Sequence, residues 1–176
     1  MLKKILWVVG GIVILFGSYV VYEILTTKKY SPADKVAFQN ESVEIEVDYC
    51  RPYKKGRNVF GDLLPYDTYW RTGANEPTII SFSDDVKFGG LKVKAGSYRL
   101  YTIPGKMTWT VALNSELETW GYWEPDYSMD VLRVEVPSQS YPCCQEQFVI
   151  QFPETEYGTD LVLIWDDVKV TVPIST

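Results

Sequence analysis

The residues best suited to binding a ligand lie in one stretch, from Cys50 to Glu76, which is also rich in glycine, proline and aromatic residues. Guanidinium groups bind carboxylate, sulfate or phosphate through paired hydrogen bonds, and aromatic faces stack on sugar rings or support arginine. The stretch therefore predicts a surface for a small anionic or carbohydrate-like ligand. The predicted binding residues are Tyr49, Arg51, Lys55, Arg57, Tyr66, Trp70, Arg71, Asn75 and Glu76.

The same cations have a structural alternative. An arginine side chain has five donors and can satisfy loop carbonyls that no strand reaches, or pair with carboxylates on nearby strands. Under this interpretation Arg51, Arg57 and Arg71 tie a long loop to the rest of the domain. Binding and folding roles both remain open from the sequence.

For catalysis, Glu76 and Asp130 are the best candidates, because each stands near a cation and aromatic residues that could shift its pKa. A pair of carboxylates can hydrolyse glycosides without histidine. The chain contains no histidine at all, which excludes Ser-His-Asp and Cys-His nucleophile systems and the usual histidine metal sites. We therefore expect no metal and no cofactor. A non-enzymatic binding domain is the leading hypothesis, and a hydrolase or a structural partner in an envelope complex are the alternatives.

The charge distribution argues against nucleic acid as a partner. The chain carries a formal charge of −6. Lys3, Lys4, Lys28 and Lys29 against Glu23 give the first thirty residues +3, which leaves −9 for the remainder. Nucleic-acid binding depends on lysine and arginine neutralising phosphates, so such an acidic domain disfavours it.

The N-terminus contains a long apolar run. Ile5 to Tyr22 is free of charge, and Ile24 and Leu25 extend the run past Glu23. This length is enough to cross a bilayer as a helix. Residues 1–30 are therefore predicted to form an uncleaved signal anchor in the bacterial cytoplasmic membrane, with cleavage near residues 16–18 as the alternative.

The rest of the chain has the pattern of an all-β domain. Residues 31–41 are predicted to be a linker, and residues 42–176 a single antiparallel β-sandwich or jelly-roll-like domain. Gly89-Gly90, Pro104-Gly105 and Asp166-Asp167 indicate turns. Runs with strand character start with residues 43–49 and continue at residues 78–82, 86–88, 91–93, 97–102, 109–113, 131–136, 148–152, 161–165 and 168–172.

Three cysteines leave the redox state open. Cys50 could bridge to Cys143 or Cys144 in an oxidising compartment, or all three could be small buried side chains in a reducing one.

Several segments resemble one bacterial family, the domain of unknown function 2911. They are Tyr49 to Tyr66, Trp70 to Glu76, Ala95 to Gly105, Trp109 to Val111, and Asp130 to Val134. The resemblance covers nearly all of the predicted domain, from about residue 42 to residue 173. This sequence departs from the family pattern at Cys50, where a small hydroxyl residue is common, and at Asp67, where glycine is common.

The resemblance implies a cellular location for the domain and no particular activity. Members resemble secreted or membrane-attached proteins of Gram-negative bacteria, often with export signals, which favours a domain facing the periplasm or exterior. No activity, substrate or oligomeric state comes with the resemblance.

Overall fold

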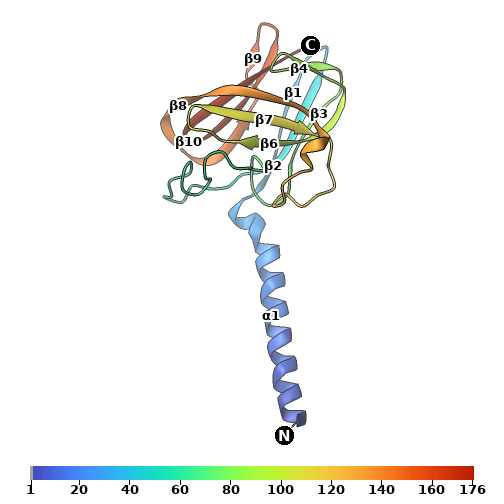
Figure 1. The fold of residues 1–176 in the computed structure, drawn as a ribbon, viewed down its shortest axis with the longest axis vertical. Helices are drawn as coiled ribbons and strands as arrows, with labels where there is room; N and C mark the ends of the chain where they lie inside the picture. Colours follow the sequence, from blue (N-terminus) through green and yellow to red (C-terminus); the bar gives the residue numbers. More distant parts are fainter. Residues whose placement is uncertain (1) are drawn as a thin grey trace.

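The chain divides into a helix and a β domain, as the computed structural model shows (Figure 1). The structure describes residues 2–176, except for the side chains of residues 2–6, 8, 23–25, 27, 28 and 143. Helix α1 spans Leu2–Tyr30 and projects away from the domain. Its exposed side chains include Trp7, Ile14, Leu15 and Phe16. Within the described part of the chain, no helix is sufficiently long and apolar to span a membrane.

The β domain is one antiparallel sheet folded on itself. Its strands run in the order β1-β2-β3-β6-β7-β8-β10-β4-β5, and β9 pairs with β10. The prediction of an all-β antiparallel domain is confirmed. The strands are β1 (Ala33–Gln39), β2 (Glu44–Cys50), β3 (Thr78–Phe82), β4 (Val86–Phe88), β5 (Leu91–Val93), β6 (Gly96–Ile103), β7 (Thr108–Asn114), β8 (Asp130–Gln151), β9 (Glu154–Thr155) and β10 (Gly158–Ser175), with a 3-10 turn, η1, at Tyr127–Met129.

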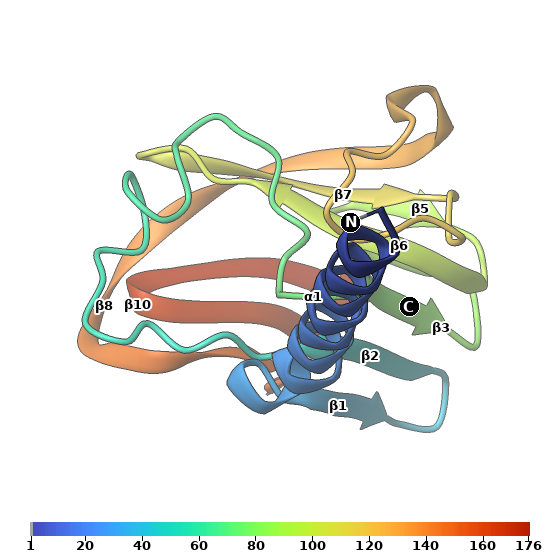
Figure 2. The same ribbon diagram turned by 90° about the horizontal axis from the view of Figure 1, so that it is seen from below.

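Two strands are longer than the sequence pattern predicts, because bends within them look like turns. Strand β8 pairs with β7 through its first part and with β10 farther on, curving around one side of the domain (Figure 2). The register between β8 and β10 shifts on both sides of Asp166. Asp166 has a φ of 54°, and its carboxylate accepts a hydrogen bond from the Lys54 ammonium. A β-bulge of this kind bends a strand without ending it.

Most of the segment predicted as a linker is strand β1. Ala33–Gln39 pairs along its whole length with β2. Val36 and Phe38 are partly buried against the core, while Lys35, Ala37 and Gln39 are exposed. This alternation is the signature of a half-buried strand. Pro32 and the charged residues obscured it in the sequence.

An aromatic cluster forms the centre of the core. The ring of Trp70 lies 5.0 Å from that of Phe148, 6.0 Å from Trp109 and 5.6 Å from Trp165, measured between centroids. Trp70 is in the long loop after β2, so this loop is part of the core. Phe60, from the same loop, packs edge-on against Trp109.

Candidate functional site

The loop of residues 51–77 is bound to the sheet at several points. The Phe148 amide donates to the Pro52 carbonyl and the Lys54 amide to the Glu146 carbonyl. Farther along, Trp70 and Thr102 exchange two backbone hydrogen bonds. Asp67 has a φ of 60°, the left-handed conformation in which glycine is favoured. The loop therefore has a defined structure that positions its side chains.

Two of its arginines make contacts that stabilise the loop. Arg51 Nε donates to the Phe148 carbonyl at 3.2 Å, and Arg51 Nη1 lies 3.2 Å from Asp34 Oδ2. Arg57 donates to the carbonyls of Lys54 and Tyr53, at 2.9 and 2.7 Å. These are the contacts that the structural interpretation describes. A ligand role for either residue stays a prediction.

Three other predicted residues contact the junction between α1 and β1. The Tyr49 hydroxyl accepts from the Ile150 amide and lies 3.4 Å from Asp34 Oδ2. The Lys55 ammonium lies 4.4 Å from the centroid of the Tyr30 ring. Asn75 Nδ2 donates to the carbonyl of residue 31 at 3.3 Å. The loop therefore connects to the base of the helix.

Tyr66 and Trp70 are packing residues in this structure. Trp70 is buried, and its indole N–H donates to the Gly73 carbonyl at 3.0 Å. Tyr66 packs against the core, and the Lys106 ammonium lies 5.7 Å from its ring centroid. Their contact with a ligand remains a prediction.

The two candidate catalytic carboxylates have different partners in the described contacts. Asp130 accepts from the Tyr101 hydroxyl and Asn114 Nδ2, both at 2.8 Å, and from Arg133 at 2.6 Å. Glu76 lines a cavity of about 220 Å³ beside β1 and β2. The residues that line this cavity do not include Asp130. The carboxylate-pair hypothesis gains no geometric support from these contacts.

Two cysteines can be placed. Cys50 is buried, and its thiol lies 3.4 Å from Glu76 Oε2. The thiol of Cys144 is exposed and unbridged. The side chain of Cys143 lies outside the described residues, and so does its predicted pairing.

The remaining arginine of the loop, Arg71, leads to a cluster that the sequence analysis missed. Arg71 Nη1 donates to the Asn75 carbonyl, and its guanidinium lies 5.8 Å from the Tyr122 ring centroid. Burial lowers the pKa of Arg71, Tyr69 opposes this effect, and the positive charge of Arg99 lowers it further. Arg71 and Arg99 are therefore close enough to repel each other.

Arg99 is the centre of this cluster. It lies on β6 and is fully buried. Its guanidinium donates to the Thr119 hydroxyl, the Tyr69 hydroxyl and the Trp123 carbonyl. Within the described residues, its Nε has no hydrogen-bond partner. A buried donor without a partner is costly and calls for an explanation.

Among the described ion pairs, this pair of arginines has one carboxylate partner. The carboxylate of Glu116 lies 4.0 Å from Arg99 Nη1, at the limit of an ion pair. The other described hydrogen-bond partners of Arg99 are neutral oxygens. A buried cation is normally paired with a carboxylate or another anion. The charges of Arg71 and Arg99 therefore favour an anion at this cluster, whose other member is Tyr69.

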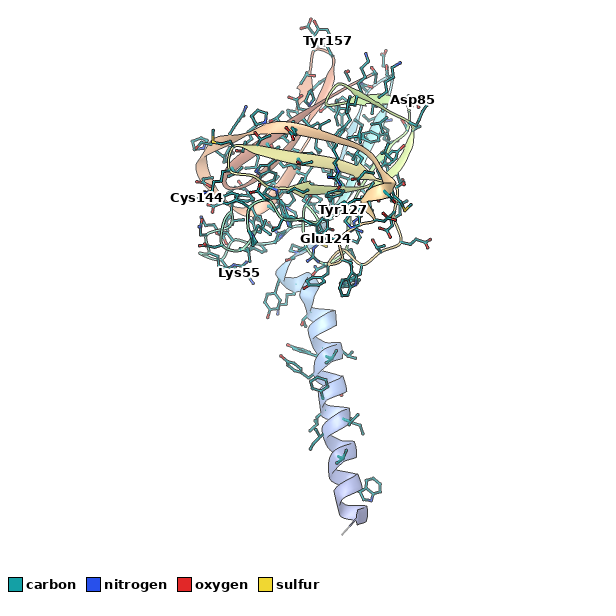
Figure 3. The ribbon with its side chains drawn as sticks, viewed as in Figure 1. Lys55, Asp85, Glu124, Tyr127, Cys144 and Tyr157 are labelled. Atoms are coloured by element: carbon teal, nitrogen blue, oxygen red, sulfur yellow. The ribbon has the colours of Figure 1, made fainter. Side chains whose placement is uncertain are left out.

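A segment between β7 and β8, residues 115–129, covers this cluster. The Tyr69 hydroxyl donates to the Gly121 carbonyl at 3.0 Å. A side chain at Gly121 would meet the backbone of residues 75–77 at 2.7 Å, so the segment lies directly on the loop. Asp126 caps η1 by accepting from the Ser128 amide at 2.9 Å. Figure 3 labels Glu124 and Tyr127 in this segment, near the end of the domain that carries α1.

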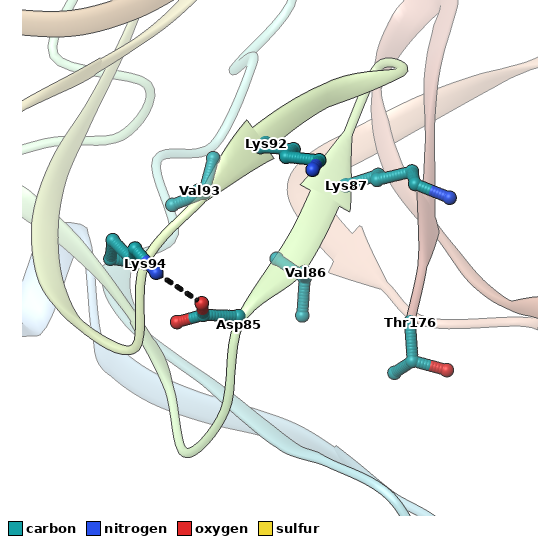
Figure 4. A pocket seen from close by; sticks show the side chains of 7 residues that line it. All are labelled: Asp85, Val86, Lys87, Lys92, Val93, Lys94 and Thr176. Carbon is teal, nitrogen blue, oxygen red and sulfur yellow. Dashed lines mark hydrogen bonds and ion pairs between the residues drawn. The ribbon is translucent and has the colours of Figure 1, made fainter.

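A different cavity, of about 280 Å³, lies beside the β4–β5 hairpin (Figure 4). Lys87 and Lys92 are cross-strand partners there, and the Lys94 ammonium pairs with the Asp85 carboxylate at 2.7 Å. Strand β5 is an edge of the sheet, where lysines prevent pairing with other chains. The two groups of the ion pair are exposed. This cavity is a weaker candidate than the cluster around Arg99.

The comparisons with known proteins give a family and no activity. Residues 31–174 match the model of a family described as "Protein of unknown function (DUF2911)". No curated protein and no solved structure matches the chain.

Proposed function

This chain belongs to the DUF2911 family, and we propose that it is a membrane-tethered domain that binds a small anionic ligand at Arg71 and Arg99. The observation that carries the proposal is the buried guanidinium of Arg99, with one donor unsatisfied among the described residues and a second cation nearby. Among the described ion pairs, its carboxylate partner is Glu116, 4.0 Å away. An anion would supply the missing acceptor and relieve the repulsion between the arginines.

The chemical class of ligand follows from the donors. A guanidinium group presents a planar fork that matches carboxylate, sulfate and phosphate. The ring of Tyr122 beside Arg71 adds an aromatic face of the type that packs on sugars. A carboxylated or phosphorylated sugar satisfies both features. The proposed site thus retains Arg71 from the predicted set and adds Tyr69, Arg99 and Tyr122.

The tether is α1. Its apolar run continues without charge from residue 5 to residue 22, and its exposed side chains include Trp7, Ile12, Leu15 and Val21. A helix that is apolar on all sides is stable only when buried in protein or lipid. We place it in the bacterial cytoplasmic membrane with the β domain outside, in keeping with the lysines that precede an export-signal-like segment.

The test is a binding titration with the full chain in detergent micelles, using glucuronate, glucose 6-phosphate and inorganic sulfate as probes in calorimetry. We expect saturable binding of at least one probe. Arg71→Gln should weaken it at least about tenfold, because a charge-assisted hydrogen bond contributes about 1.5–3 kcal/mol.

The matched control is Arg57→Gln, which removes an exposed guanidinium bonded only to loop carbonyls among its described hydrogen bonds. Its affinity should equal that of the wild type. Equal losses in the two variants would indicate a general charge effect and contradict the site. The absence of saturable binding of all three probes to the wild type would reject the proposed ligand class.

A further inference from the structure

The junction between helix and domain is too short to hold the domain away from a membrane. Only Ser31 and Pro32 separate α1 from β1. The apolar run ends at Leu25 and the helix at Tyr30, so the helix rises only about 7.5 Å beyond the run. The headgroup layer on each side of a bilayer is about 5–7 Å thick. If α1 spans the bilayer, the near end of the domain must touch this layer.

The junction is also held in place. The Arg51 amide donates to the Pro32 carbonyl at 2.9 Å, and Asn75 Nδ2 donates to the Ser31 carbonyl at 3.3 Å. The Lys55 ammonium contacts the Tyr30 ring. These contacts join the end of the helix to the loop of residues 51–77. The domain therefore presents one particular face toward the base of the helix.

An exposed aromatic group lies at that end of the domain. The segment of residues 115–129 runs there, as the position of Glu124 shows, whereas Asp85 and Tyr157 mark the opposite end (Figure 3). Trp120 is 56% exposed, and Tyr122 and Trp123 are each 64% exposed. Tryptophan and tyrosine are enriched at membrane interfaces, because their rings are apolar and their N–H or O–H groups are polar.

From this geometry we infer that the segment of residues 117–123 docks into the headgroup layer of the membrane that holds α1. The inference rests on the proposed tether, and the docking segment shares Tyr122 with the proposed anion site. Its test changes only Trp120 and Trp123, which the anion site does not use. The segment is preorganised for this contact, because Tyr69 and Arg99 bind the carbonyls of Gly121 and Trp123 and leave the aromatic side chains outside.

Charge limits the depth of this contact. The exposed carboxylates of Glu118 and Glu124 flank the aromatic side chains and stay in water. The rings therefore enter the headgroup layer and not the hydrocarbon core. Lys55, at the same end of the domain, offsets part of this negative charge next to the lipid phosphates.

Tryptophan fluorescence of the full chain in phosphatidylcholine nanodiscs tests the inference. Trp70, Trp109 and Trp165 are buried, and Trp7 lies near the start of α1, about 3 Å inside the apolar run. The headgroup quenching that is lost when Trp120 and Trp123 are replaced therefore reports on these two residues. We expect strong quenching by a lipid with a nitroxide on its headgroup and weak quenching by iodide. The double variant Trp120→Phe with Trp123→Phe should lose most of the headgroup-dependent quenching.

The matched control adds Tyr157→Trp to that double variant. Tyr157 is 74% exposed and lies at the far end of the domain, so the new indole should be quenched by iodide and not by the headgroup nitroxide. In the double variant, quenching of Trp7 by lipids brominated in the acyl chains reports on the tether alone. Loss of that signal would reject the tether.

Two results would overturn the docking inference while leaving the tether intact. The first is strong iodide quenching of Trp120 and Trp123 without headgroup quenching, which means that the segment faces water. The second is protection from both quenchers, which means that another protein or a second copy of the chain covers the segment.

Discussion

The Arg99 guanidinium donates to the Tyr69 hydroxyl, and this hydroxyl donates in turn to the Gly121 carbonyl at 3.0 Å. The relationship joins three parts of the chain: the long loop after β2, the central strand β6 and the segment that covers both. One buried charge thus organises the outer side of the sheet. Removing the hydrogen-bond partners of Arg99 one at a time should show which of them stabilise the fold and which are needed for ligand binding.

Replacing Tyr69 with phenylalanine keeps the ring and removes the hydroxyl that links Arg99 to Gly121. We expect the free energy of unfolding to fall by about 1–3 kcal/mol, because a buried charged donor loses an acceptor. Urea denaturation of the full chain in detergent measures this change. Tyr157→Phe removes an exposed hydroxyl and should change stability by less than about 0.5 kcal/mol. Equal effects in both variants would contradict a structural role for the link.

Gly121→Ala tests how tightly the covering segment packs on the loop. A Cβ atom at this position would lie 2.7 Å from the Asn75 carbonyl oxygen and from backbone atoms of the next two residues. Because backbone atoms cannot move aside cheaply, we expect a loss of about 1–3 kcal/mol. Amide hydrogen exchange in residues 115–129 should also become faster.

The control for this variant is Glu118→Ala, in the same segment and exposed. Its stability and exchange rates should match those of the wild type. Unchanged exchange in Gly121→Ala would mean that the segment does not depend on its contact with the loop.

The short strands of the fold could be predicted because no bulge interrupts the two-residue repeat of their side chains. Predicted residues 78–82, 86–88 and 91–93 coincide with β3, β4 and β5. Gly89 and Gly90, with φ values of 57° and 85°, form the predicted hairpin turn. The long strands were each predicted as two, because the bulge at Asp166 and the irregular pairing of β8 interrupt the alternation without ending the strand. Only tertiary pairing distinguishes a bulge from a turn.

The site was harder to predict than the fold. Arg51 and Arg57 were predicted to bind a ligand because they lie close to Lys55 and Arg71 in the sequence. Arg51 instead donates to the Phe148 carbonyl in β8, and Arg57 donates to carbonyls of the loop itself. Arg99 lies alone in an alternating strand, where the pattern predicts an outward and solvated side chain. It is buried because a segment about twenty residues later folds over it. The sequence around Arg99 does not predict that a distant segment covers it.

Arg51→Gln tests the connection between the loop and β1. The substitution removes the ion pair with Asp34 and the hydrogen bond to the Phe148 carbonyl. Both groups of the ion pair are partly exposed, so it contributes little, and the total loss should be about 1–2 kcal/mol. Arg57→Gln provides the comparison and should cost less than about 1 kcal/mol, because its guanidinium is exposed. A smaller effect at Arg51 than at Arg57 would contradict the proposed connection.

The pH dependence of stability tests the Tyr101–Asp130 pair. Burial raises the pKa of Tyr101, and the hydrogen bond to the Asp130 carboxylate raises it further. A tyrosine in the unfolded chain has a pKa of about 10. Because the pKa of Tyr101 is higher in the folded state, its contribution to the free energy of unfolding is fully present below about pH 10. This contribution is lost as the pH rises through the pKa of the folded state. Tyr101→Phe removes this contribution.

In urea denaturation at a series of alkaline pH values, the wild type should therefore lose stability more steeply than Tyr101→Phe. The slope should not vanish in the variant, because burial also raises the pKa values of Tyr49 and Tyr69 and, to about 12, that of Tyr127. At neutral pH the variant should be less stable by about 1–3 kcal/mol, since it loses a hydrogen bond to a charged acceptor. Identical alkaline slopes in the two proteins would show that Tyr101 ionises no differently in the folded and unfolded states, and the hydrogen bond to Asp130 would then contribute nothing to the fold.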